Sequence, residues 1–298
     1  MIIRRLKIVF NNPSLLIKLL LYLFSPFFSD RTYLKLMSFV CFGKAFDLYN
    51  PVSFNEKMNW LKLNHKQYWY TTLVDKIAVK EYVKNKLGEA YVIPLIKKWE
   101  NLEEINLNDL PQKCVIKSNC DSSGVIIYKK GITTLEFIRK VLKKKKTLYN
   151  YYYYSREYPY KGVKQCYYAE NFIESVDGDI IKDFKFWCFN GVPRVVYVTV
   201  KNDDIYENFY DMNFSPLNID HNLRRRHPEF KEPVGFNEMK KIASILSKDI
   251  PFVRIDFFHT GKKFYFSEFT FYDWGGLKPF NGEWDIKLGE LLVLPNAK

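Results

Sequence analysis

The chain has 298 residues, of which 47% are hydrophobic and 27% are charged, a composition typical of a folded globular protein and not of a disordered one. A chain of this length can form one large domain or two to three smaller ones. Lysine and arginine number 46 and aspartate and glutamate 33, which gives a net charge of +13. This charge favours polyanionic partners, namely nucleotides, nucleic acids, acidic glycans or an anionic membrane, without choosing among them.

Cysteine and histidine spacing argues against several kinds of site. The five cysteines, Cys41, Cys114, Cys120, Cys166 and Cys188, include no closely spaced pair and no disulfide pattern. They are expected to be free thiols in a reducing cytoplasm, and buried structural cysteines are favoured over a catalytic one. The four histidines are scattered, so a zinc site is not expected.

The N-terminal segment, residues 1–47, is predicted to be helical. Three of its first seven residues are basic, and a leucine-rich run follows at 15–24. A transmembrane helix needs roughly 20 apolar residues, and Lys18 and Pro26 interrupt this run too early. No small-residue cleavage site of a secretory signal follows. The pattern predicts an amphipathic helix that packs on the body of the protein, the favoured alternative, or lies on the inner face of the membrane.

Two helices are predicted after this segment. Ser53 and Glu56 have the spacing of a capping box, which begins a helix that runs to about residue 62. A second helix is predicted from near residue 73 to residue 87. Lys76 would lie in its first turn, where a positive charge opposes the helix dipole and a phosphate ligand would compensate it.

A small-residue loop at 118–124 is predicted between strands at 113–117 and 125–128. Such a loop can offer backbone N–H groups to phosphate oxygens, with Lys117 as a point charge beside them. It has one glycine, Gly124, and lacks the P-loop pattern. Taken alone, an ordinary hairpin loop is the favoured alternative.

A basic helix at 135–146 precedes a run of tyrosines at 149–154. Basic and aromatic side chains together can bind single-stranded nucleic acid. A solvated lysine face is favoured, because no nucleic-acid recognition fold is visible.

The second half of the chain is rich in predicted strands, at 166–174, 183–189 and 194–200. Asn190-Gly191 predicts a type I′ hairpin turn between the last two. Residues 202–234 are predicted to be loop-rich, and a helix with an apolar stripe is predicted at about 237–247.

Residues 253–258 and 264–270 alternate apolar and polar side chains, as expected of a half-buried hairpin. Arg254, Asp256 and Glu268 project from one face if the loop between the strands holds an odd number of residues. Two carboxylates and an arginine are costly to bury without a cation or an anionic ligand. A magnesium–nucleotide site is therefore predicted, with a solvent-facing salt-bridge cluster as the open alternative. A flexible turn is predicted at 273–276.

The order of these motifs resembles the ATP-grasp fold, and most closely its TupA-like branch, which is named for teichuronopeptide biosynthesis. The resemblance covers roughly residues 48–298. It implies an α+β fold in which two α+β subdomains grip ATP, with a lid subdomain at roughly 110–165, after the N-terminal helical segment. It is carried by Ser53-Phe54-Asn55-Glu56-Lys57, Asp75-Lys76, Val115-Ile116-Lys117, Glu170-Asn171-Phe172-Ile173, Asp183-Phe184-Lys185, Phe186-Trp187-Cys188-Phe189-Asn190-Gly191, Val253-Arg254-Ile255-Asp256-Phe257-Phe258 and Glu268-Phe269-Thr270.

The resemblance implies a set of nucleotide ligands. Lys76 and Lys117 would hold the α- and β-phosphates of ATP, and the lid over them would be formed by Ser122, Ser123 and Gly124.

The adenosine moiety would be bound by the strand that follows the lid. Glu170 would accept a hydrogen bond from the adenine amino group, and Asp177, or else Glu174, would hold the ribose hydroxyls. The adenine edge would be read by the backbone of Asn171, Phe172 and Ile173.

The reacting groups are implied in the same way. Lys185 would meet the γ-phosphate, and Arg254 would stabilise the acyl phosphate and its tetrahedral successor. Asp256 and Glu268 would bind Mg²⁺. The family usually has an asparagine that completes the site of a second Mg²⁺, and Thr270 stands at that position here. A hydroxyl binds this second ion more weakly than an amide oxygen does.

The resemblance implies a cytoplasmic, ATP- and Mg²⁺-dependent ligase that joins a carboxylate to an amine through an acyl phosphate. Its substrates would be a uronic-acid-containing bacterial surface polysaccharide or precursor and an amino acid or amine. Peripheral contact with the inner membrane is the expectation that the N-terminal helix adds. The alternatives are a phosphotransferase of the same fold that acts on a sugar, and a non-enzymatic membrane- or nucleic-acid-binding protein. No nucleic-acid partner is expected.

Overall fold

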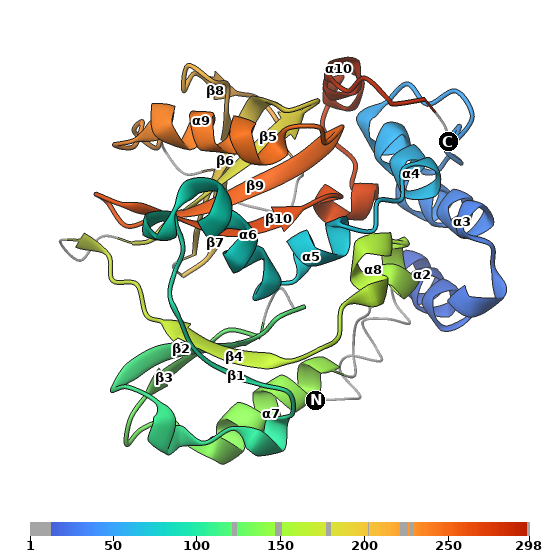
Figure 1. Cartoon of the computed structure of the whole chain (residues 1–298). Coiled ribbons are helices and arrows are strands. Elements are labelled where there is room, and N and C mark those ends of the chain that lie inside the picture. The colour runs from blue at the N-terminus through green and yellow to red at the C-terminus, as the bar shows by residue number, and fades with distance from the viewer. Residues whose placement is uncertain are drawn as a thin grey trace.

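Two antiparallel sheets lie in separate layers, with helical segments between and beside them (Figure 1). The computed structural model describes residues 13–120, 124–146, 151–176, 180–201, 203–220, 226 and 229–296. The α+β class predicted from the sequence is confirmed.

The large sheet has the strand order β10-β9-β5-β6-β7-β8. Its strands are β5 (Lys182–Phe189), β6 (Val192–Lys201), β7 (Ile205–Tyr210), β8 (Pro216–Leu217), β9 (Phe252–His259) and β10 (Phe264–Thr270). Residues 205–217 therefore extend the sheet where loops were predicted. The β5–β6 turn is as predicted, because Asn190 and Gly191 both have positive φ, at 49° and 80°.

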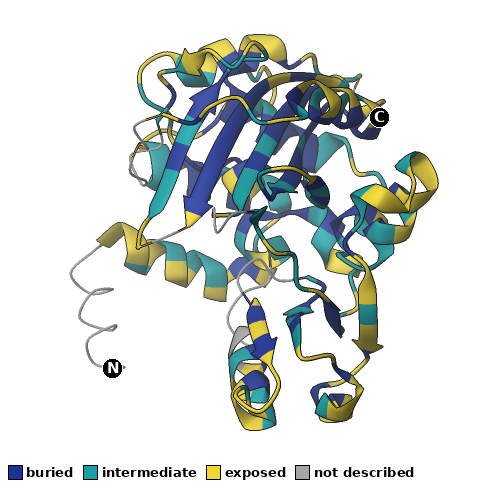
Figure 2. Cartoon of the chain, turned by 90° about the vertical axis from the view of Figure 1, so that its left-hand side faces the viewer, coloured by how far each residue is buried: buried dark blue, intermediate teal, exposed yellow. Residues whose placement is uncertain are grey.

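Helix α9 (Phe236–Ser247) packs on one face of the large sheet through its predicted apolar stripe. Figure 2 shows that the central strands of the sheet are buried along most of their length. The stripe, Met239, Ile242, Ala243 and Leu246, belongs to the same hydrophobic core as the sheet residues. The charged residues of the site described below lie on the other face of the sheet, beside Trp187 and Tyr197.

The small sheet has the order β1-β4-β2-β3 and its own hydrophobic core. Its strands are β1 (Leu95–Trp99), β2 (Lys113–Ser118), β3 (Ile126–Lys129) and β4 (Tyr167–Asn171). Helix α7 (Leu135–Lys146) contributes Ile138 and Leu142 to that core. Since the two sheets have separate cores, they form two separately packed units.

The predicted N-terminal helices are present as α2 (Pro13–Leu23) and α3 (Asp30–Phe42), which are joined by the short helix η1 (Ser25–Phe27). They share a third, small core that includes Tyr33 and Met37. Within the described ranges, the helices are all too short or too polar to cross a membrane.

Helix α4 (Phe54–Asn64) begins with the predicted capping box of Ser53 and Glu56. The helix predicted from residue 73 to residue 87 is wrong at its start, because it is divided into α5 (Tyr70–Val74) and α6 (Ala78–Leu87). The division has a local cause: the Asp75 carboxylate accepts hydrogen bonds from the amides of Ile77 at 2.8 Å and Ala78 at 3.2 Å.

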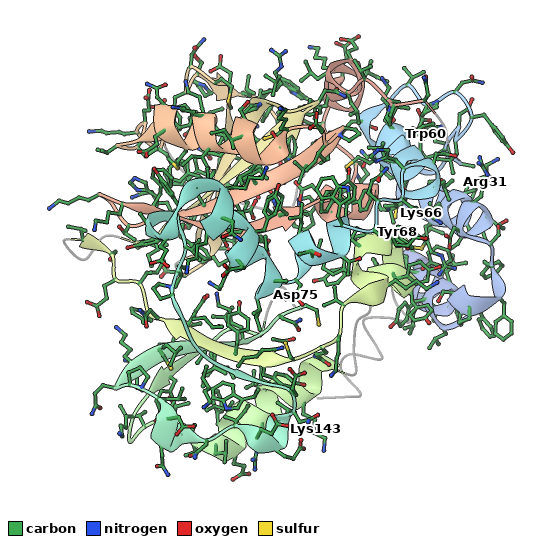
Figure 3. The ribbon with its side chains drawn as sticks, viewed as in Figure 1. Arg31, Trp60, Lys66, Tyr68, Asp75 and Lys143 are labelled. Carbon is green, nitrogen blue, oxygen red and sulfur yellow. The ribbon has the colours of Figure 1, made fainter. Side chains whose placement is uncertain are left out.

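Figure 3 shows Asp75, at the break between α5 and α6, between the two sheets.

The remaining helices are α8 (Tyr151–Ser155), α10 (Trp284–Leu291), and the short helices η2 (Glu89–Tyr91), η3 (Leu102–Glu104), η4 (Leu107–Asp109), η5 (Tyr158–Gly162) and η7 (Asp273–Gly276).

Candidate active site

A β-bulge brings the charged residues of the β9–β10 hairpin to one face. The loop between the strands is residues 260–263, an even number of residues. If the register that pairs Phe266 with Phe257 continued along the strands, Glu268 and Asp256 would project from different faces of the sheet. The register shifts between Phe266 and Glu268, so Glu268 becomes the cross-strand partner of Asp256 and projects from the same face. The predicted cluster exists, but a bulge produces it and not an odd-numbered loop.

Asp256 is the centre of this cluster and is fully buried. Arg254 donates to both of its carboxylate oxygens at 2.7 Å, through Nε and Nη2. Lys185, its register partner on β5, donates from Nζ at 2.7 Å. Arg254 Nη2 also donates to Glu268 Oε1 at 3.0 Å. Four of the predicted site residues are therefore in direct contact.

The charges of the cluster are mutually dependent. Burial raises the pKa of Asp256 against the opposing effect of Arg254 and Lys185. Burial would also raise the pKa of Glu268, but Lys76, Arg254 and Lys185 outweigh it and lower that pKa to about 2. For Lys185, burial is outweighed by the carboxylates of Asp183 and Asp256, and its pKa is raised. Glu268 and Lys185 are thus held in their charged forms.

Asp273 holds Arg254 from the other side, a role that the sequence did not reveal. Its Oδ1 accepts a hydrogen bond from Arg254 Nη1. Its Oδ2 accepts from Trp187 Nε1 at 2.8 Å and from the Tyr197 hydroxyl at 3.1 Å, while Arg254 Nη1 also donates to that hydroxyl at 3.1 Å. The guanidinium is therefore fixed along both edges. The only sequence signal was an aspartate two residues before a pair of glycines.

The segment 273–276 is a constrained turn and not the flexible one predicted. Trp274, Gly275 and Gly276 all have positive φ, at 51°, 62° and 56°. Helix α4 holds its carbonyls, since Lys62 Nζ donates to Gly275 O at 2.6 Å and Asn59 Nδ2 to Gly276 O at 2.6 Å. A Cβ at Gly276 would lie 3.0 Å from Asn59 Nδ2. The buried polar face of α4 thus positions the turn that carries Asp273.

The small sheet contributes a second buried carboxylate, Glu170. Lys80 Nζ lies 2.8 Å from its Oε2, and Lys117 forms an ion pair with its Oε1. Burial would raise the pKa of Glu170, but the two lysines outweigh it and lower that pKa. Lys80 was missed, although it lies four residues after Lys76. The Lys117 ammonium is also 5.8 Å from the centroid of the Phe258 ring on the large sheet.

Lys76 connects the two sheets. Its Nζ lies 3.4 Å from Glu268 Oε2 of the large sheet. Its amide donates to Asn119 O, just after strand β2, at 3.1 Å, and Asn119 Nδ2 donates to Asp75 at 2.8 Å. The break between α5 and α6 therefore lies in contact with both layers.

Thr270 lies opposite Arg254 in the β9–β10 register and so shares the face of Glu268. Carboxylate oxygens are donors that Mg²⁺ prefers, and a hydroxyl oxygen can be a weaker ligand. A buried oxygen of Asp183, Oδ1, accepts no hydrogen bond from the described part of the chain, and its other oxygen is 3.2 Å from Lys185 Nζ. These donors fit a magnesium ion. Among the described residues, no preformed group of three or more His, Cys, Asp or Glu side chains could hold a metal.

The other predicted nucleotide ligands that the structure describes lie on the small sheet or next to its strands. Asn171, Phe172 and Ile173 lie at and just after the end of β4, where the Lys113 ammonium is 3.6 Å from the Phe172 ring centroid. Gly124 is buried. Ser122, Ser123 and Asp177 lie outside the described residues.

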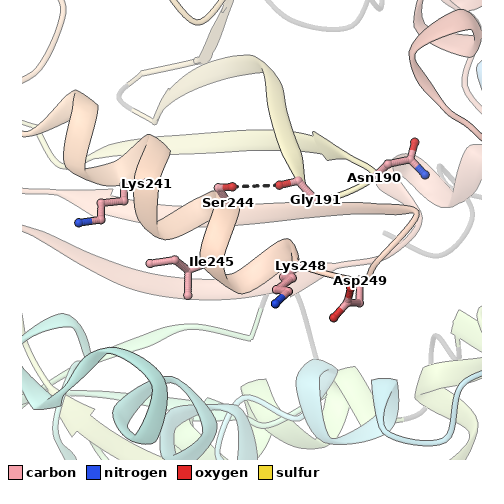
Figure 4. A pocket seen from close by; sticks show the side chains of 7 residues that line it. All are labelled: Asn190, Gly191, Lys241, Ser244, Ile245, Lys248 and Asp249. Atoms are coloured by element: carbon pink, nitrogen blue, oxygen red, sulfur yellow. Dashed lines mark hydrogen bonds between the residues drawn. The ribbon is translucent and has the colours of Figure 1, made fainter.

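A separate surface pocket contains none of the residues that were predicted to bind ATP, Mg²⁺ or the reacting groups. It has a volume of about 520 Å³ and lies at the end of α9 against the β5–β6 turn (Figure 4). Its lining is Asn190, Gly191, Lys241, Ser244, Ile245, Lys248 and Asp249. It is not part of the charged cluster between the sheets.

The two facing sheets and their charged cluster define a protein of the ATP-grasp class. The sequence matches the TupA-like ATP-grasp family over residues 56–293, which is most of the chain. The chain belongs to the TupA-like ATP-grasp family. Proteins of the ATP-grasp class use ATP and Mg²⁺, in agreement with the expected cofactors.

Solved structures with a similar course of the chain are ligases by name. One is D-alanine–D-alanine ligase from Bacillus anthracis complexed with ATP, at 13% identity and a TM-score of 0.42, matched over 67% of this chain and 55% of that one. Another is the Helicobacter pylori D-alanine–D-alanine ligase, at 16% identity and a TM-score of 0.37, over 69% and 55%.

The ATP-grasp ligase PsnB complexed with its minimal precursor gives 9% identity and a TM-score of 0.39, over 81% and 61%. This chain thus spans between about half and two thirds of the length of these ligases. No curated protein is significantly similar to it in sequence. The assignment of this chain to a protein family therefore depends on the family match alone.

Proposed function

We propose that this chain is an ATP-dependent ligase that joins a carboxylate to an amine through an acyl phosphate. The observation that carries the proposal is the cluster of Arg254, Glu268 and Lys185 around the fully buried Asp256. Lys117 of the small sheet lies close to the same strand, with its ammonium 5.8 Å from the Phe258 ring centroid. A free carboxylate has no good leaving group at neutral pH, so it must be phosphorylated before an amine can displace it. The cluster suits that transfer, because it combines oxygen ligands for a cation with fixed positive charges.

The nucleotide would lie between the two sheets. Lys76 and Lys117 are proposed to hold its phosphates, together with the lid residues Ser122, Ser123 and Gly124. The argument for the two lysines is that each is tied to a carboxylate by an ion pair, which a phosphate oxygen can replace.

The adenosine half is proposed to lie at the end of β4. Glu170 and the backbone of Asn171, Phe172 and Ile173 would bind adenine, and Asp177 the ribose. The exposed Asn171 and the half-buried Phe172 and Ile173 leave backbone near solvent at this point. Adenine binding to Glu170 would require its carboxylate to exchange an ion pair with Lys80 or Lys117 for the adenine amino group.

Magnesium is proposed to be held by Asp256, Glu268 and Thr270, and it would neutralise charge on the phosphates. Ligation by Asp256 and Glu268 would require Arg254 to release a carboxylate oxygen. The guanidinium would stay in place, since Asp273 and Tyr197 hold its other edge.

Lys185 and Arg254 are proposed to act on the reacting groups. Lys185, kept charged by two carboxylates, would meet the γ-phosphate. Arg254 would stabilise the oxyanion that forms when the amine attacks, a contribution that depends on its fixed orientation. Water must be excluded because the acyl phosphate hydrolyses, which a closing lid would achieve.

The lid is proposed to centre on residues 110–165 of an ATP-grasp domain that spans 48–298. The small sheet itself is wider than that range, since it includes β1 and β4. Closure of this layer would bring Lys117 and the loop after β2 towards the large sheet.

The substrates are proposed to be a uronic-acid-containing bacterial surface polysaccharide, or its precursor, and an amino acid or amine. The net charge of +13 suits an anionic polymer. A cytoplasmic location is proposed, since the reaction consumes ATP and the five cysteines are free thiols.

The test is to incubate the protein with Mg-ATP and panels of uronic acids and amines, and to measure phosphate release. With hydroxylamine in place of the amine, a ligase gives a hydroxamate because the acyl phosphate is trapped. A phosphorylated sugar without hydroxamate would instead identify a phosphotransferase. Absence of any nucleotide-dependent thermal shift would contradict both reactions. The Asp256→Asn variant serves as the inactive control.

A further inference from the structure

Helix α2 and the short helix η1 present an apolar surface to solvent. None of the eleven residues of α2 is buried. The exposed fraction is 60% for Leu23, 54% for Phe24 and 82% for Phe27. We call the following set the α2 apolar surface: Leu15, Leu19, Leu20, Leu23, Phe24 and Phe27. An exposed apolar patch of this kind marks an interaction site more often than a random surface.

The opposite side of the same helix is fixed to the body. Leu21 packs against the small N-terminal core, and the rings of Tyr22 and Tyr154 are 6.3 Å apart. Arg156, which is buried, donates to Ser25 O in η1. The helix is thus held in one orientation, with its outer side chains directed away from the protein. Figure 2 shows it projecting from the body, with exposed and intermediate residues only.

Charge indicates what covers this surface. The sequence has no acidic residue before Asp30, and Arg4, Arg5, Lys7 and Lys18 are its only charged residues up to that point. A second copy of the chain would bring these positive charges together, whereas an anionic surface would attract them. Eleven helical residues span about 16 Å, roughly half of the hydrocarbon thickness of a bilayer, so α2 would lie along the membrane interface and not across it.

We propose that the α2 apolar surface docks on an anionic lipid bilayer, whose negative charge complements the positive charge of the N-terminal sequence. The apolar side chains enter the boundary between headgroups and acyl chains, which is how interfacial helices bind.

The docked surface lies next to the part of the protein that orients Arg254. Arg156 contacts η1, and its neighbour Ser155 would be 3.0 Å from a Cβ at Gly275, in the turn that begins with Asp273. A lipid-borne acceptor would therefore approach the site from the membrane side. This last step rests on the proposed ligase activity, whereas docking does not.

The test is flotation of the full chain, without nucleotide, with vesicles of phosphatidylcholine alone or mixed with phosphatidylglycerol. Binding to the anionic vesicles is expected, and it should weaken as salt is added. The double variant Leu23→Glu/Phe27→Glu should lower the bound fraction by at least about tenfold. The matched control is Ile132→Glu, which changes a side chain that is 75% exposed on the small-sheet side and should bind as the unchanged chain does.

Equal flotation of the double variant and the unchanged chain would overturn the proposal, as would no binding to anionic vesicles. A dimer in light scattering that the double variant abolishes, without vesicle binding, would show that a second copy covers the surface. Phosphate release with soluble substrates separates the two proposals. The double variant should keep it, and its loss in every form of the protein would contradict the ligase and not the docking.

Discussion

Asp256 on the large sheet and Glu170 on the small sheet are both buried carboxylates between two cations, but the cations have different origins. Arg254 lies two residues before Asp256 on the same face of β9, and Lys185 is the register partner of Asp256 on β5, so the large sheet alone brings both to Asp256. Glu170 is paired with Lys117 on its own sheet and with Lys80 from helix α6.

The difference separates a preorganised half from an adjustable one. The Asp256 cluster is fixed mainly by one sheet and by the turn that α4 holds, with Lys76 added to it from the break between α5 and α6. The Glu170 cluster depends on how α6 sits between the layers, so it can change when the layers move. We therefore expect substitutions in the first cluster to abolish chemistry, and substitutions in the second to weaken nucleotide binding.

The largest effect is expected for Asp256→Asn. Loss of this carboxylate removes a magnesium ligand and leaves Arg254 and Lys185 buried without their shared partner. Phosphate release should fall by at least about 10³-fold, and the free energy of unfolding in urea by about 3–5 kcal/mol. Asp249→Asn, at an exposed position in the turn after α9, is the control and should change neither. Normal turnover of Asp256→Asn would show that the large sheet is not the preorganised half.

Acid should weaken the large-sheet cluster through Glu268. Its pKa in the folded protein is about 2, below the ordinary 4.5. A carboxylate whose pKa is lowered by folding contributes its full stabilisation at pH values above its pKa in the unfolded chain. That stabilisation is lost as the pH falls through its pKa in the folded protein. Between pH 4.5 and 2, about 3 kcal/mol should be lost. Urea unfolding across this range should show a steeper pH dependence for the unchanged chain than for Glu268→Gln. Parallel curves would mean that the ion pairs of Glu268 do not stabilise the fold.

Asp273→Asn tests whether the turn orients Arg254. The amide keeps the size of the side chain but removes the charge that holds the guanidinium. Turnover should fall by about 10- to 100-fold, while the Kd for Mg-ATP, measured by calorimetry, stays unchanged. Asp273→Glu should recover part of the turnover. Equal losses in binding and turnover would indicate a general structural role.

The smallest effect is expected for Lys80→Met on the small-sheet side. Glu170 keeps Lys117 as a partner, and the reacting groups are untouched. The KM for ATP should rise by about tenfold with kcat nearly constant. Lys84→Met is the matched control, since Lys84 lies one turn further along α6 and pairs with Glu89 at the surface. A fall in kcat that equals that of Asp273→Asn would remove the distinction between the two halves.

The sequence by itself determined the features that depend on neighbouring residues. The capping box at Ser53, the Asn190-Gly191 turn and the apolar stripe of α9 were correct, because each arises from backbone geometry within a few positions. The order of the motifs was sufficient for the family, which the match over residues 56–293 confirms.

Only the tertiary structure decided which charged side chains meet. The bulge before Glu268, the Lys80–Glu170 ion pair and the hold of Asp273 on Arg254 left no periodic signal in the sequence. The last two join residues that are far apart along the chain, and their energies depend on burial, which strand pairing and helix packing create. Local sequence patterns therefore predicted which strands and helices carry the charged side chains. The packing of those elements decided which charged side chains contact one another.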